Sequence, residues 1–269
     1  REHFPSAIII ATGKNTGFAG VTNAGIRRAK GEYLLTLNND TVLDPRFLEE
    51  IQKPMLLDPH VGTCGSKMLL LDGRINSTGI CFSRSGAAWD RGGGENDHGQ
   101  FDASEEVFGA CAGAALYRRS MLDEIGLFDE DFFLFMEDVD LAFRARLAGW
   151  KCMYVPTAKV VHVQGGTSGT HSDLSVYYGN RNLLWYIVKD FPATMLFLSL
   201  PWIISRNCAD IPFYLLQGKG RAIFRAKIDM LRGLYGMIRK RGSVQRKVPV
   251  REIRKWISPA NYPWRQRRS

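Results

Sequence analysis

The sequence predicts an α/β fold that is followed by a helical and strongly basic C-terminal region. Over residues 7–163, short apolar runs of strand length alternate with amphipathic stretches of helical length, which is the pattern of strand–helix units. From Ser172 onward the apolar pattern is helical for most of the remaining chain. Hydrophobic residues make up 45% of the 269 residues, enough to bury a full-sized core.

The first part of the chain predicts two strand–helix pairs. Residues 7–11 are an apolar run typical of a buried strand, and a turn rich in Gly and Asn leads to a helix over 18–29. The run 33–37 predicts the next strand. Residues 44–57 begin with Asp-Pro, which caps a helix and occupies its first turn, so a helix follows there.

The middle of the chain combines extended segments with one long polar segment. Residues 61–71 and 75–82 read as extended, whereas 84–106 are polar and Gly-rich, and a loop of that length is usually functional or disordered. The next predicted elements are a strand at 112–117, a helix at 120–125, a helix at 137–148, and strands at 152–155 and 160–163.

The charge is distributed unevenly along the chain. Residues 1–179 carry 17 Lys and Arg against 23 Asp and Glu, a formal charge of −6, while residues 180–269 carry 19 against 4, a formal charge of +15. This asymmetry predicts that the C-terminal part meets a polyanionic surface, either an anionic membrane or a nucleic acid. A solvated basic face is the alternative. Because no nucleic-acid-binding motif is present, the membrane is favoured and no nucleic-acid partner is expected.

Three apolar or basic segments of this C-terminal part predict contact with a bilayer surface. Residues 191–205 are mostly apolar but too short for a confident membrane span. Together with the apolar run 211–216 and the basic amphipathic stretch 221–241, they are typical of a surface that lies on an anionic bilayer. An ordinary helical subdomain packed on the α/β part is the alternative.

The first candidate site follows the strand at 33–37. Asn38, Asn39 and Asp40 stand at its end, where Asn and Asp are also common in turns without any function. Ligands collect at the carboxyl ends of strands in α/β sheets, and carboxylate oxygens are hard ligands that suit divalent cations. Asp40 is therefore the leading candidate for a metal ligand.

The second candidate site opens the helix at 137–148. Glu137, Asp138 and Asp140 are favoured at a helix start simply because they interact with the positive end of the helix dipole. However, the apolar segment 132–136 precedes them, and carboxylates emerging from a buried entry are costly unless they are paired or used. The three side chains point in different directions around the helix, so one base with one or two structural partners is the economical division of roles.

His162 lies between valines on the last predicted strand. A hydrogen-bonded core histidine is the usual explanation for such a position. Imidazole is also a good ligand for Mn²⁺-like ions beside carboxylates, so a metal site is the alternative, and the spacing does not decide between them. The Gly-rich segment 165–169 lacks the lysine of a P-loop. On the following helix, Arg181, Asn182 and Lys189 could meet a diphosphate, although cations on amphipathic helices are usually solvated.

The five cysteines are widely spaced, and no pair has metal-ligand spacing. We expect reduced and mostly buried thiols, which favours a cytosolic compartment. With the basic C-terminal part, this predicts a peripheral protein at the cytoplasmic face of the cell membrane.

Several ordered segments together resemble a known family. They are Asn-Thr-Gly-Phe-Ala-Gly at 15–20, Asn-Ala-Gly at 23–25, Gly-Glu-Tyr-Leu-Leu at 31–35, Leu-Asn-Asn-Asp-Thr at 37–41, Phe-Asp-Glu at 128–130 and Glu-Asp-Val-Asp-Leu at 137–141. From about residue 7 to 182 the chain resembles the family-two inverting glycosyltransferases with a GT-A fold, especially their rhamnosyltransferase-like branch.

The resemblance implies a metal-dependent enzyme that uses a nucleotide-sugar donor, a dTDP- or UDP-sugar, and a glycan or lipid-linked acceptor in cell-surface polysaccharide synthesis. It implies Mg²⁺ or Mn²⁺ at Asp40 with His162 completing the metal shell, and Asp138 as the catalytic base. The other implied site residues are Asn15, Gly17, Asn23, Asn38, Asn39 and Gly113 for the donor, and Glu137, Asp140, Trp89 and Arg181 for the acceptor or for support.

The resemblance, together with the change of pattern and charge along the chain, predicts two regions, a GT-A core over 1–172 and a helical, basic, membrane-associating region over 173–269. Members of the family begin with an Asn-Tyr-Asn-like segment and a strand ending in Val-Asp, which bind the nucleobase and ribose. Neither is present in this sequence, so we expect it to begin just before the third strand of the fold. A non-catalytic sugar-binding or scaffold module with the same fold is the alternative function.

Overall fold

The structure is a computed structural model that describes residues 6–163 and 172–258. Its helices are α1 (Gly17–Arg28), α2 (Phe47–Leu57), α3 (Arg119–Ile125), the 3-10 turn η1 (Glu130–Phe132), α4 (Glu137–Ala148), α5 (Asp173–Asp190), α6 (Ala193–Leu216), α7 (Gly220–Arg241) and α8 (Val250–Arg254). Its strands are β1 (Tyr33–Leu37), β2 (Thr41–Leu43), β3 (Val61–Leu70), β4 (Ile75–Ser77), β5 (Ile80–Phe82), β6 (Ala88–Asp90), β7 (Glu105–Val107), β8 (Ala114–Arg118) and β9 (Lys151–His162).

A mixed seven-stranded sheet forms the centre of the molecule. Its main order is β1-β8-β3-β9-β2, with β4 added beside β3 and β7 beside β9. The β3–β9 pair is parallel and the other pairs are antiparallel. Strands β5 and β6 form a separate hairpin. The predicted mixed α/β class is confirmed.

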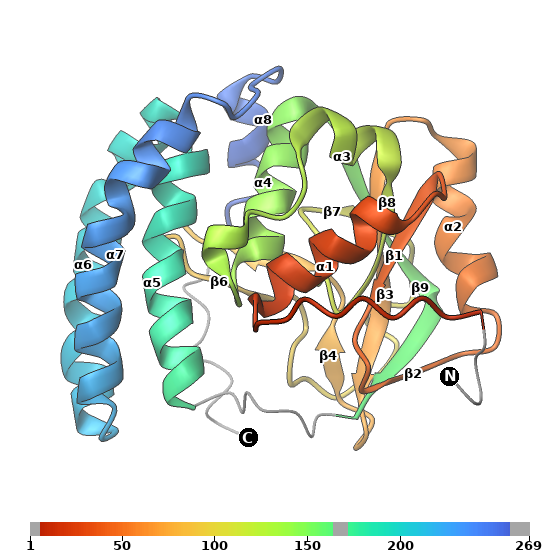
Figure 1. Cartoon of the computed structure of the whole chain (residues 1–269), viewed down its shortest axis with the longest axis horizontal. Coiled ribbons are helices and arrows are strands. Elements are labelled where there is room, and N and C mark those ends of the chain that lie inside the picture. The colour runs from red at the N-terminus through yellow and green to blue at the C-terminus, as the bar shows by residue number, and fades with distance from the viewer. Residues whose placement is uncertain (1–5, 164–171, 259–269) are drawn as a thin grey trace.

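Helices cover both faces of the sheet (Figure 1). On one face, Phe47, Ile51 and Met55 of α2 pack against β3, β8 and β9. On the other face, α1, α3 and α4 share an apolar cluster that includes Ile26 and Leu141. Both clusters are built from the periodic apolar positions of amphipathic helices, which explains why the sequence pattern located these helices.

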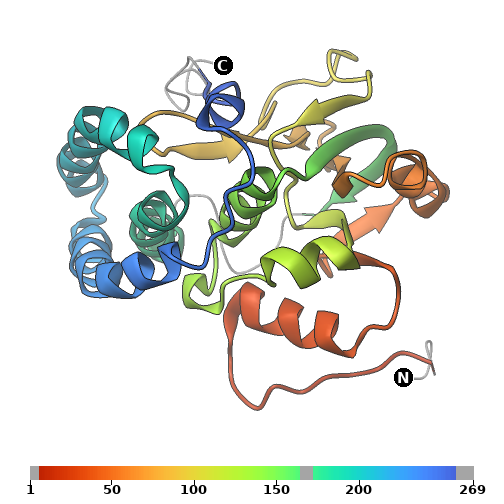
Figure 2. The ribbon, with the colours of Figure 1, turned by 90° about the horizontal axis from the view of Figure 1, so that it is seen from above.

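The helices α5, α6 and α7 gather on one side of the sheet (Figures 1 and 2). A single buried cluster joins them to the α/β part, because Phe82, Phe108 and Phe143 pack with Tyr186 and Phe191. The C-terminal helices therefore share a core with the strands instead of standing apart from them. In the part of the chain that the structure describes, no helix is long and apolar enough to cross a membrane.

The predicted strand at 7–11 is wrong. These residues adopt no regular structure, and Ile8 and Ile9 are each 65% exposed. A strand needs a neighbour for its backbone hydrogen bonds. Among the described residues, β1 pairs only with β8, and no strand partner lies beside residues 7–11. An apolar run of strand length was thus not sufficient to form a strand.

Other element boundaries also differ from the prediction. The extended segment 75–82 is broken into β4 and β5 by a turn in which Gly79 has a φ of +135°. The two strands expected at 152–155 and 160–163 are one long strand, β9, and the polar segment 84–106 contains β6 and the beginning of β7. These elements depend on pairing with distant strands, which local pattern does not encode.

Candidate active site

A cavity of about 480 Å³ opens where β1, β8 and β9 meet the start of α4. It is lined by Asn38 and Asp40 after β1, Gly113 before β8, His162 at the end of β9, and Glu137 and Asp138 on α4. Trp89 and Asp90 of β6 form another wall. The two acidic segments of the sequence, almost a hundred residues apart, therefore face one space.

Asp40 and His162 are brought together by strand register. Thr41 of β2 lies opposite His162 of β9, so the preceding Asp40 places its Oδ1 3.1 Å from Nε2 of His162. The other ring nitrogen, Nδ1, lies 2.6 Å from Oδ1 of Asn76. An amide oxygen only accepts, so Nδ1 donates to it, and a lone pair on Nε2 would then face the carboxylate and be available to a metal ion.

This pair fits a divalent cation. Two acceptors that face each other at 3.1 Å are compatible with a shared cation, and a hydrogen bond from Nδ1 to a fixed oxygen is typical of metal-bound histidine. Over residues 6–163 and 172–258, no group of three or more His, Cys, Asp or Glu side chains has metal-site geometry. Among the described residues, Asp40 and His162 would supply two ligands, and further positions would remain for diphosphate oxygens and water.

Asp138 lies half-buried in the first turn of α4. Its Oδ1 accepts from the backbone N–H of Val139 at 2.8 Å and its Oδ2 from that of Ala112 at 3.4 Å. Burial raises the pKa of Asp138, although these hydrogen bonds oppose the rise. The carboxylate is thus held against the cavity and has gained basicity.

Glu137 is buried beside Asp138. Burial, and then the charge of Asp138, raise the pKa of Glu137 to about 8. One of its carboxylate oxygens has no hydrogen-bond partner among the described residues. Burial therefore favours the protonated form of Glu137, and within this pair Asp138 is the carboxylate left to accept a proton.

Asp90 is a cavity residue that the sequence did not reveal. Burial raises its pKa to about 7, with a further contribution from Asp138, while Ser77 and Cys111 lower it. It lies in the polar segment 84–106, which the sequence predicts to be one long loop. Only the folding of the β5–β6 hairpin over the cavity brings Asp90 to the site, so its local sequence carries no usable signal.

The loop that enters α4 is strained. Phe133, Phe135 and Met136 all have φ between 66° and 69°, a region that non-glycine residues rarely adopt. Strained backbone of this kind collects near functional sites when the surroundings hold it in place.

Asn182 of α5 holds this loop. It is fully buried, and its amide nitrogen donates to the carbonyl oxygens of Phe132, Leu134 and Phe135 at 2.7 to 2.9 Å. The sequence indicated Asn182 only as a contact for a diphosphate, and its role in holding this loop was not foreseen. A buried amide whose partners are backbone carbonyls of a distant segment follows from the fold and not from the local sequence.

The predicted donor residues divide between the cavity and its surroundings. Asn38 lines the cavity and its backbone N–H donates to the carbonyl of Gly113 at 2.9 Å. A Cβ at Gly113 would lie 3.2 Å from Met68 and 3.3 Å from Asn38, so this position is tightly enclosed. Asn39 lies in the exposed turn that follows Asn38 and is not part of the cavity lining.

The predicted donor residues of the α1 region are placed outside this cavity lining. Asn15 accepts a hydrogen bond from the N–H of Gly17 at 2.9 Å, in the turn that begins α1. Gly17 has a φ of +69°, and a Cβ there would collide with the carbonyl of Phe133. Asn23 is buried and exchanges two hydrogen bonds with the backbone of Phe128. These residues secure α1 against the 128–133 segment.

Asp140 and Arg181 also lie outside the cavity lining. Asp140 is fully buried and forms ion pairs with Arg144 and Lys189. Arg181 donates to the carbonyls of Asp131 and Phe132 at 2.9 Å, and its guanidinium lies 4.1 Å from the ring centre of Trp185. Both support the loop and helix that carry Asp138. The segment 165–169 lies outside the described residues.

All five cysteines are free, as the sequence predicted. Cys64 and Cys152 are buried, Cys81 and Cys111 are half-buried, and Cys208 is exposed. We expected mostly buried thiols, and two of the five are fully buried.

A comparison with models of protein families identifies the family of this chain. A family model described as "Glycosyltransferase like family 2" matches residues 2–185. The chain belongs to this family. The resemblance that rested on residues 7–182 is thereby confirmed, and with it the glycosyltransferase class.

Relatives of this glycosyltransferase include rhamnosyltransferases. The chain is 25% identical over 264 residues to N-acetylglucosaminyl-diphospho-decaprenol L-rhamnosyltransferase of Mycobacterium tuberculosis, a match that covers 86% of this chain and 83% of that protein. It is 38% identical over 89 residues to rhamnosyltransferase WbbL of Escherichia coli K12, which covers 33% of this chain and 31% of the relative. The predicted rhamnosyltransferase-like branch is supported by both.

A solved glycosyltransferase has the same core fold. The crystal structure of GalNAc-T7 with UDP, GalNAc and Mn²⁺ superimposes with a TM-score of 0.52 at 14% identity, covering 70% of this chain and 40% of that one. At this level of identity the superposition shows a shared fold and nothing more. It confirms the GT-A architecture.

Proposed function

We propose that the chain transfers a sugar from a nucleotide-sugar donor to a hydroxyl group of a lipid-linked glycan, with inversion at the anomeric carbon. The observation that carries this proposal is the single cavity that Asp138 shares with Asp40 and His162. A proton acceptor and a cation-binding pair on two sides of one space are the two parts that a displacement at a sugar diphosphate requires.

Asp138 acts as the general base in this proposal. Its carboxylate takes the proton of the acceptor hydroxyl while the hydroxyl oxygen attacks the anomeric carbon. The new glycosidic bond forms on one side of that carbon, and the bond to the diphosphate oxygen breaks on the other with its electron pair. A raised pKa suits this role, because the base must accept a proton near neutral pH.

Asp40 and His162 would hold Mg²⁺ or Mn²⁺ against the donor diphosphate. When bound, the cation neutralises the charge on the leaving diphosphate. The facing acceptors of the two side chains support this, and the similar fold of GalNAc-T7 was solved with Mn²⁺ and UDP. The donor is a dTDP- or UDP-sugar, and the rhamnosyltransferase relatives support rhamnose as the sugar.

We place the enzyme peripherally at the cytoplasmic face of the cell membrane, in cell-surface polysaccharide synthesis. The M. tuberculosis relative is named for a diphospho-decaprenol acceptor, which is lipid-linked. The formal charge of +15 over residues 180–269 supports contact with an anionic bilayer. Residues 1–172 then form the catalytic region and residues 173–269 the membrane-associating region.

The test is a screen of nucleotide sugars with Mn²⁺ and a polyprenyl-diphosphate-linked acceptor. We expect Asp138→Asn to lose roughly 10²- to 10⁴-fold in turnover with donor affinity largely intact, because only the base is removed. Asp40→Ala should lose donor binding together with stimulation by Mn²⁺.

A matched control is Glu95→Gln, which neutralises an exposed carboxylate outside the cavity lining and should leave turnover unchanged. Unchanged turnover of Asp138→Asn would refute its role as the base. If the unaltered chain hydrolyses and transfers none of the donors, the non-catalytic sugar-binding alternative is supported instead.

A further inference from the structure

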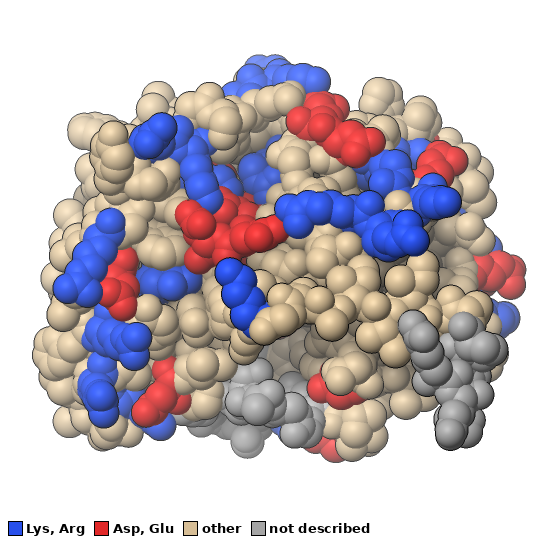
Figure 3. All heavy atoms as spheres, in the orientation of Figure 1, with Lys and Arg blue, Asp and Glu red and all other residues tan. Residues whose placement is uncertain are grey.

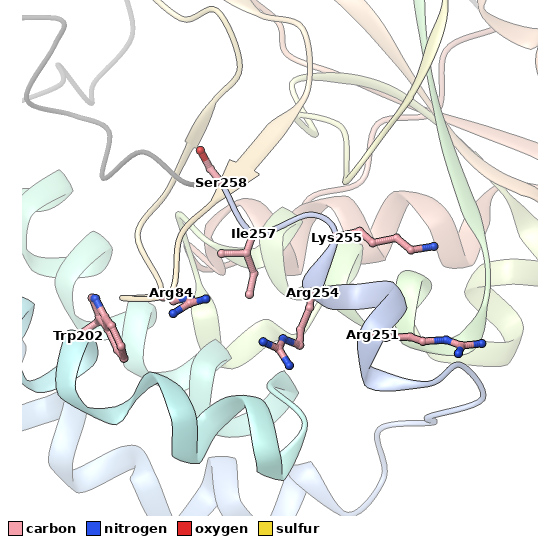
Figure 4. A pocket seen from close by; sticks show the side chains of 7 residues that line it. All are labelled: Arg84, Trp202, Arg251, Arg254, Lys255, Ile257 and Ser258. Carbon is pink, nitrogen blue, oxygen red and sulfur yellow. The ribbon is translucent and has the colours of Figure 1, made fainter.

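A second cavity, of about 690 Å³, lies between the β5–β6 turn, α6 and α8 (Figure 4). It shares no lining residue with the active-site cavity. Its lining is mostly cationic, and consists of Arg84, Trp202, Arg251, Arg254, Lys255, Ile257 and Ser258. The glycosyl transfer proposed above makes no use of this space.

The cations of this second cavity are poorly neutralised. Arg84 and Arg254 are exposed, and neither has an ion-pair partner within residues 6–163 and 172–258. Arg251 and Lys255 share a single acid, Glu252. In Figure 4, Arg84 lies beside Trp202 and Arg254 extends from α8 toward the same space, while Arg251 and Lys255 extend away from it. Unpaired guanidinium groups that face one space are suited to a phosphate group.

The walls of this cavity are held in place. The backbone N–H of Ser258 donates to the carbonyl of Phe82 at 2.8 Å, and Ile257 forms a β-bridge with Phe82. Trp256 packs on the core, where its ring lies 4.4 Å from the guanidinium of Arg146. The segment after α8 is therefore anchored to β5, which holds the backbone of α8 beside the cavity.

An apolar surface begins at the edge of the same cavity. Trp202 of α6 is 41% exposed, and the guanidinium of Arg84 lies 5.3 Å from its ring centre. On α6, the exposed Phe197, Leu200 and Ile204 are spaced by three and four residues, so they share one face of the helix. Tryptophan beside cations and exposed aliphatic side chains is typical of the boundary between lipid headgroups and acyl chains.

The neighbouring helix α7 presents a second apolar stripe. Its exposed apolar residues alternate in spacing by four and three, and they are Phe224, Ile228, Leu231, Tyr235 and Ile238. The opposite face of α7 is buried, through residues such as Ile223 and Met230. The stripe is therefore additional to the face that α7 uses for packing, and exposed apolar area of this extent indicates an interaction surface.

The charged residues beside the apolar stripe of α7 indicate which kind of surface the stripe contacts. Arg225, Arg232 and Arg239 follow at seven-residue spacing along one flank, and Asp229 is the one acidic residue of α7. Figure 3 shows basic side chains along this side of the molecule, with a smaller number of acidic side chains and uncharged surface between them. Two copies packed through the stripe would bring rows of like charge together. The surface of an anionic bilayer would bury the apolar stripe and attract the flanking cations.

We propose that the cavity at Arg84 and Arg254 binds the phosphate headgroup of an anionic bilayer lipid, while the exposed faces of α6 and α7 rest on the bilayer surface. This inference rests on the membrane location in the proposed function and adds a defined headgroup site to it. Arg84 and Arg254 supply the charge-assisted hydrogen bonds, and Trp202 occupies the headgroup boundary.

The experiment is sedimentation of the full chain with vesicles of phosphatidylcholine that contain phosphatidylglycerol. The double variant Arg84→Glu with Arg254→Glu should bind these vesicles about tenfold or more weakly, since each basic residue near an anionic surface contributes substantially to binding. The matched control is Arg28→Glu with Lys30→Glu, which changes net charge equally at exposed positions near the end of α1. Equal weakening in both double variants would overturn a defined site in favour of diffuse charge, and unchanged binding of the first would overturn it outright.

Two further measurements separate a bilayer lipid from a free phosphate. Phe197→Ser with Ile228→Ser should weaken vesicle binding, and inorganic diphosphate at matched ionic strength should not displace the unaltered chain. Displacement by inorganic diphosphate together with full vesicle binding by the serine variant would overturn the lipid assignment. Arg84→Lys with Arg254→Lys should retain most vesicle binding, and its failure to do so would count against an electrostatic headgroup site.

The active-site variant distinguishes this inference from the proposed function. Asp138→Asn should bind the vesicles as the unaltered chain does while losing sugar transfer. Loss of vesicle binding in that variant would contradict a headgroup site that is separate from the active site.

Discussion

Two groups of acidic residues meet at α4 and differ in their partners. Glu137 and Asp138 face the active-site cavity without a cation among their described contacts, and burial raises the pKa of both. Asp140, two residues further along α4, forms ion pairs with Arg144 and Lys189. Lys189 also binds Asp129, whose pKa falls to about 2 because Lys189 and Lys240 outweigh the opposing effect of burial.

The presence or absence of a cationic partner separates the carboxylates that can act in catalysis from those that stabilise the fold. A carboxylate with a fixed cation is stabilised in its charged form and is of little use as a base. A carboxylate without one keeps a raised pKa and can accept a proton, at a cost in stability. The paired cluster joins η1, α4, α5 and α7, and so anchors the helix on which the unpaired cluster stands.

The largest expected effect breaks the paired cluster. Lys189→Met should lower the free energy of unfolding by about 3–5 kcal/mol, because it leaves Asp140 and Asp129 with fewer cationic partners in a buried site. Urea unfolding of the variant measures this. The control is Lys53→Met, which removes a half-exposed ion pair with Glu50 and should cost less than about 1 kcal/mol. Equal losses in the two variants would contradict the structural role of the cluster.

The next prediction concerns the unpaired cluster. Glu137 has its pKa raised from 4.5 to about 8, so the folded state binds a proton more tightly than the unfolded state does, and stability should fall as pH rises from about 4.5 to 8. Glu137→Gln removes this loss and should stabilise the fold by about 3 kcal/mol more at pH 8 than at pH 5. Unfolding curves at the two pH values measure it, and a gain that does not depend on pH would show that Glu137 is ionised throughout.

Asp129 should show the opposite dependence on pH. Its folded pKa of about 2 lies below the usual 3.8, so its contribution of about 2 kcal/mol is present above pH 4 and is lost as pH falls toward 2. Asp129→Asn should therefore be less stable than the unaltered chain at pH 6, with the difference shrinking in acid. A difference that persists undiminished at pH 2 would exclude the ion pairs as its cause.

The last prediction tests whether the loop that enters α4 connects the stability of the fold to the position of Asp138. Asn182→Ala removes three hydrogen bonds to the strained 132–135 segment and should cost about 1–3 kcal/mol. Because this segment positions Asp138, turnover should fall by more than the fraction of unfolded protein explains. Asn180→Ala, which removes one buried bond within α5, serves as the control. A variant that unfolds more readily but turns over normally when folded would restrict Asn182 to a structural role.

Much of the fold and part of the site followed from local pattern. Residues 33–37 and 137–148 were predicted with their observed boundaries, because the first is a short apolar run and the second repeats apolar residues at helical spacing until Gly149 ends it. Asp40, Asp138 and His162 were identified as candidates from residue type and neighbours. The strand expected at 7–11 failed because a strand also requires a partner, which no local pattern supplies.

The sequence by itself determined the α/β class, the family, the concentration of positive charge after residue 180 and the residues with the right chemistry. Tertiary structure decided which carboxylates are paired, since residue type alone does not separate Asp138, which faces the cavity, from Asp140, which lies between two cations. It also brought Asp90 and Asn182 to the site and gathered Arg84 and Arg254 around one cavity. These outcomes depend on contacts between segments far apart in the chain, whose geometry is set by packing and not by neighbouring residues.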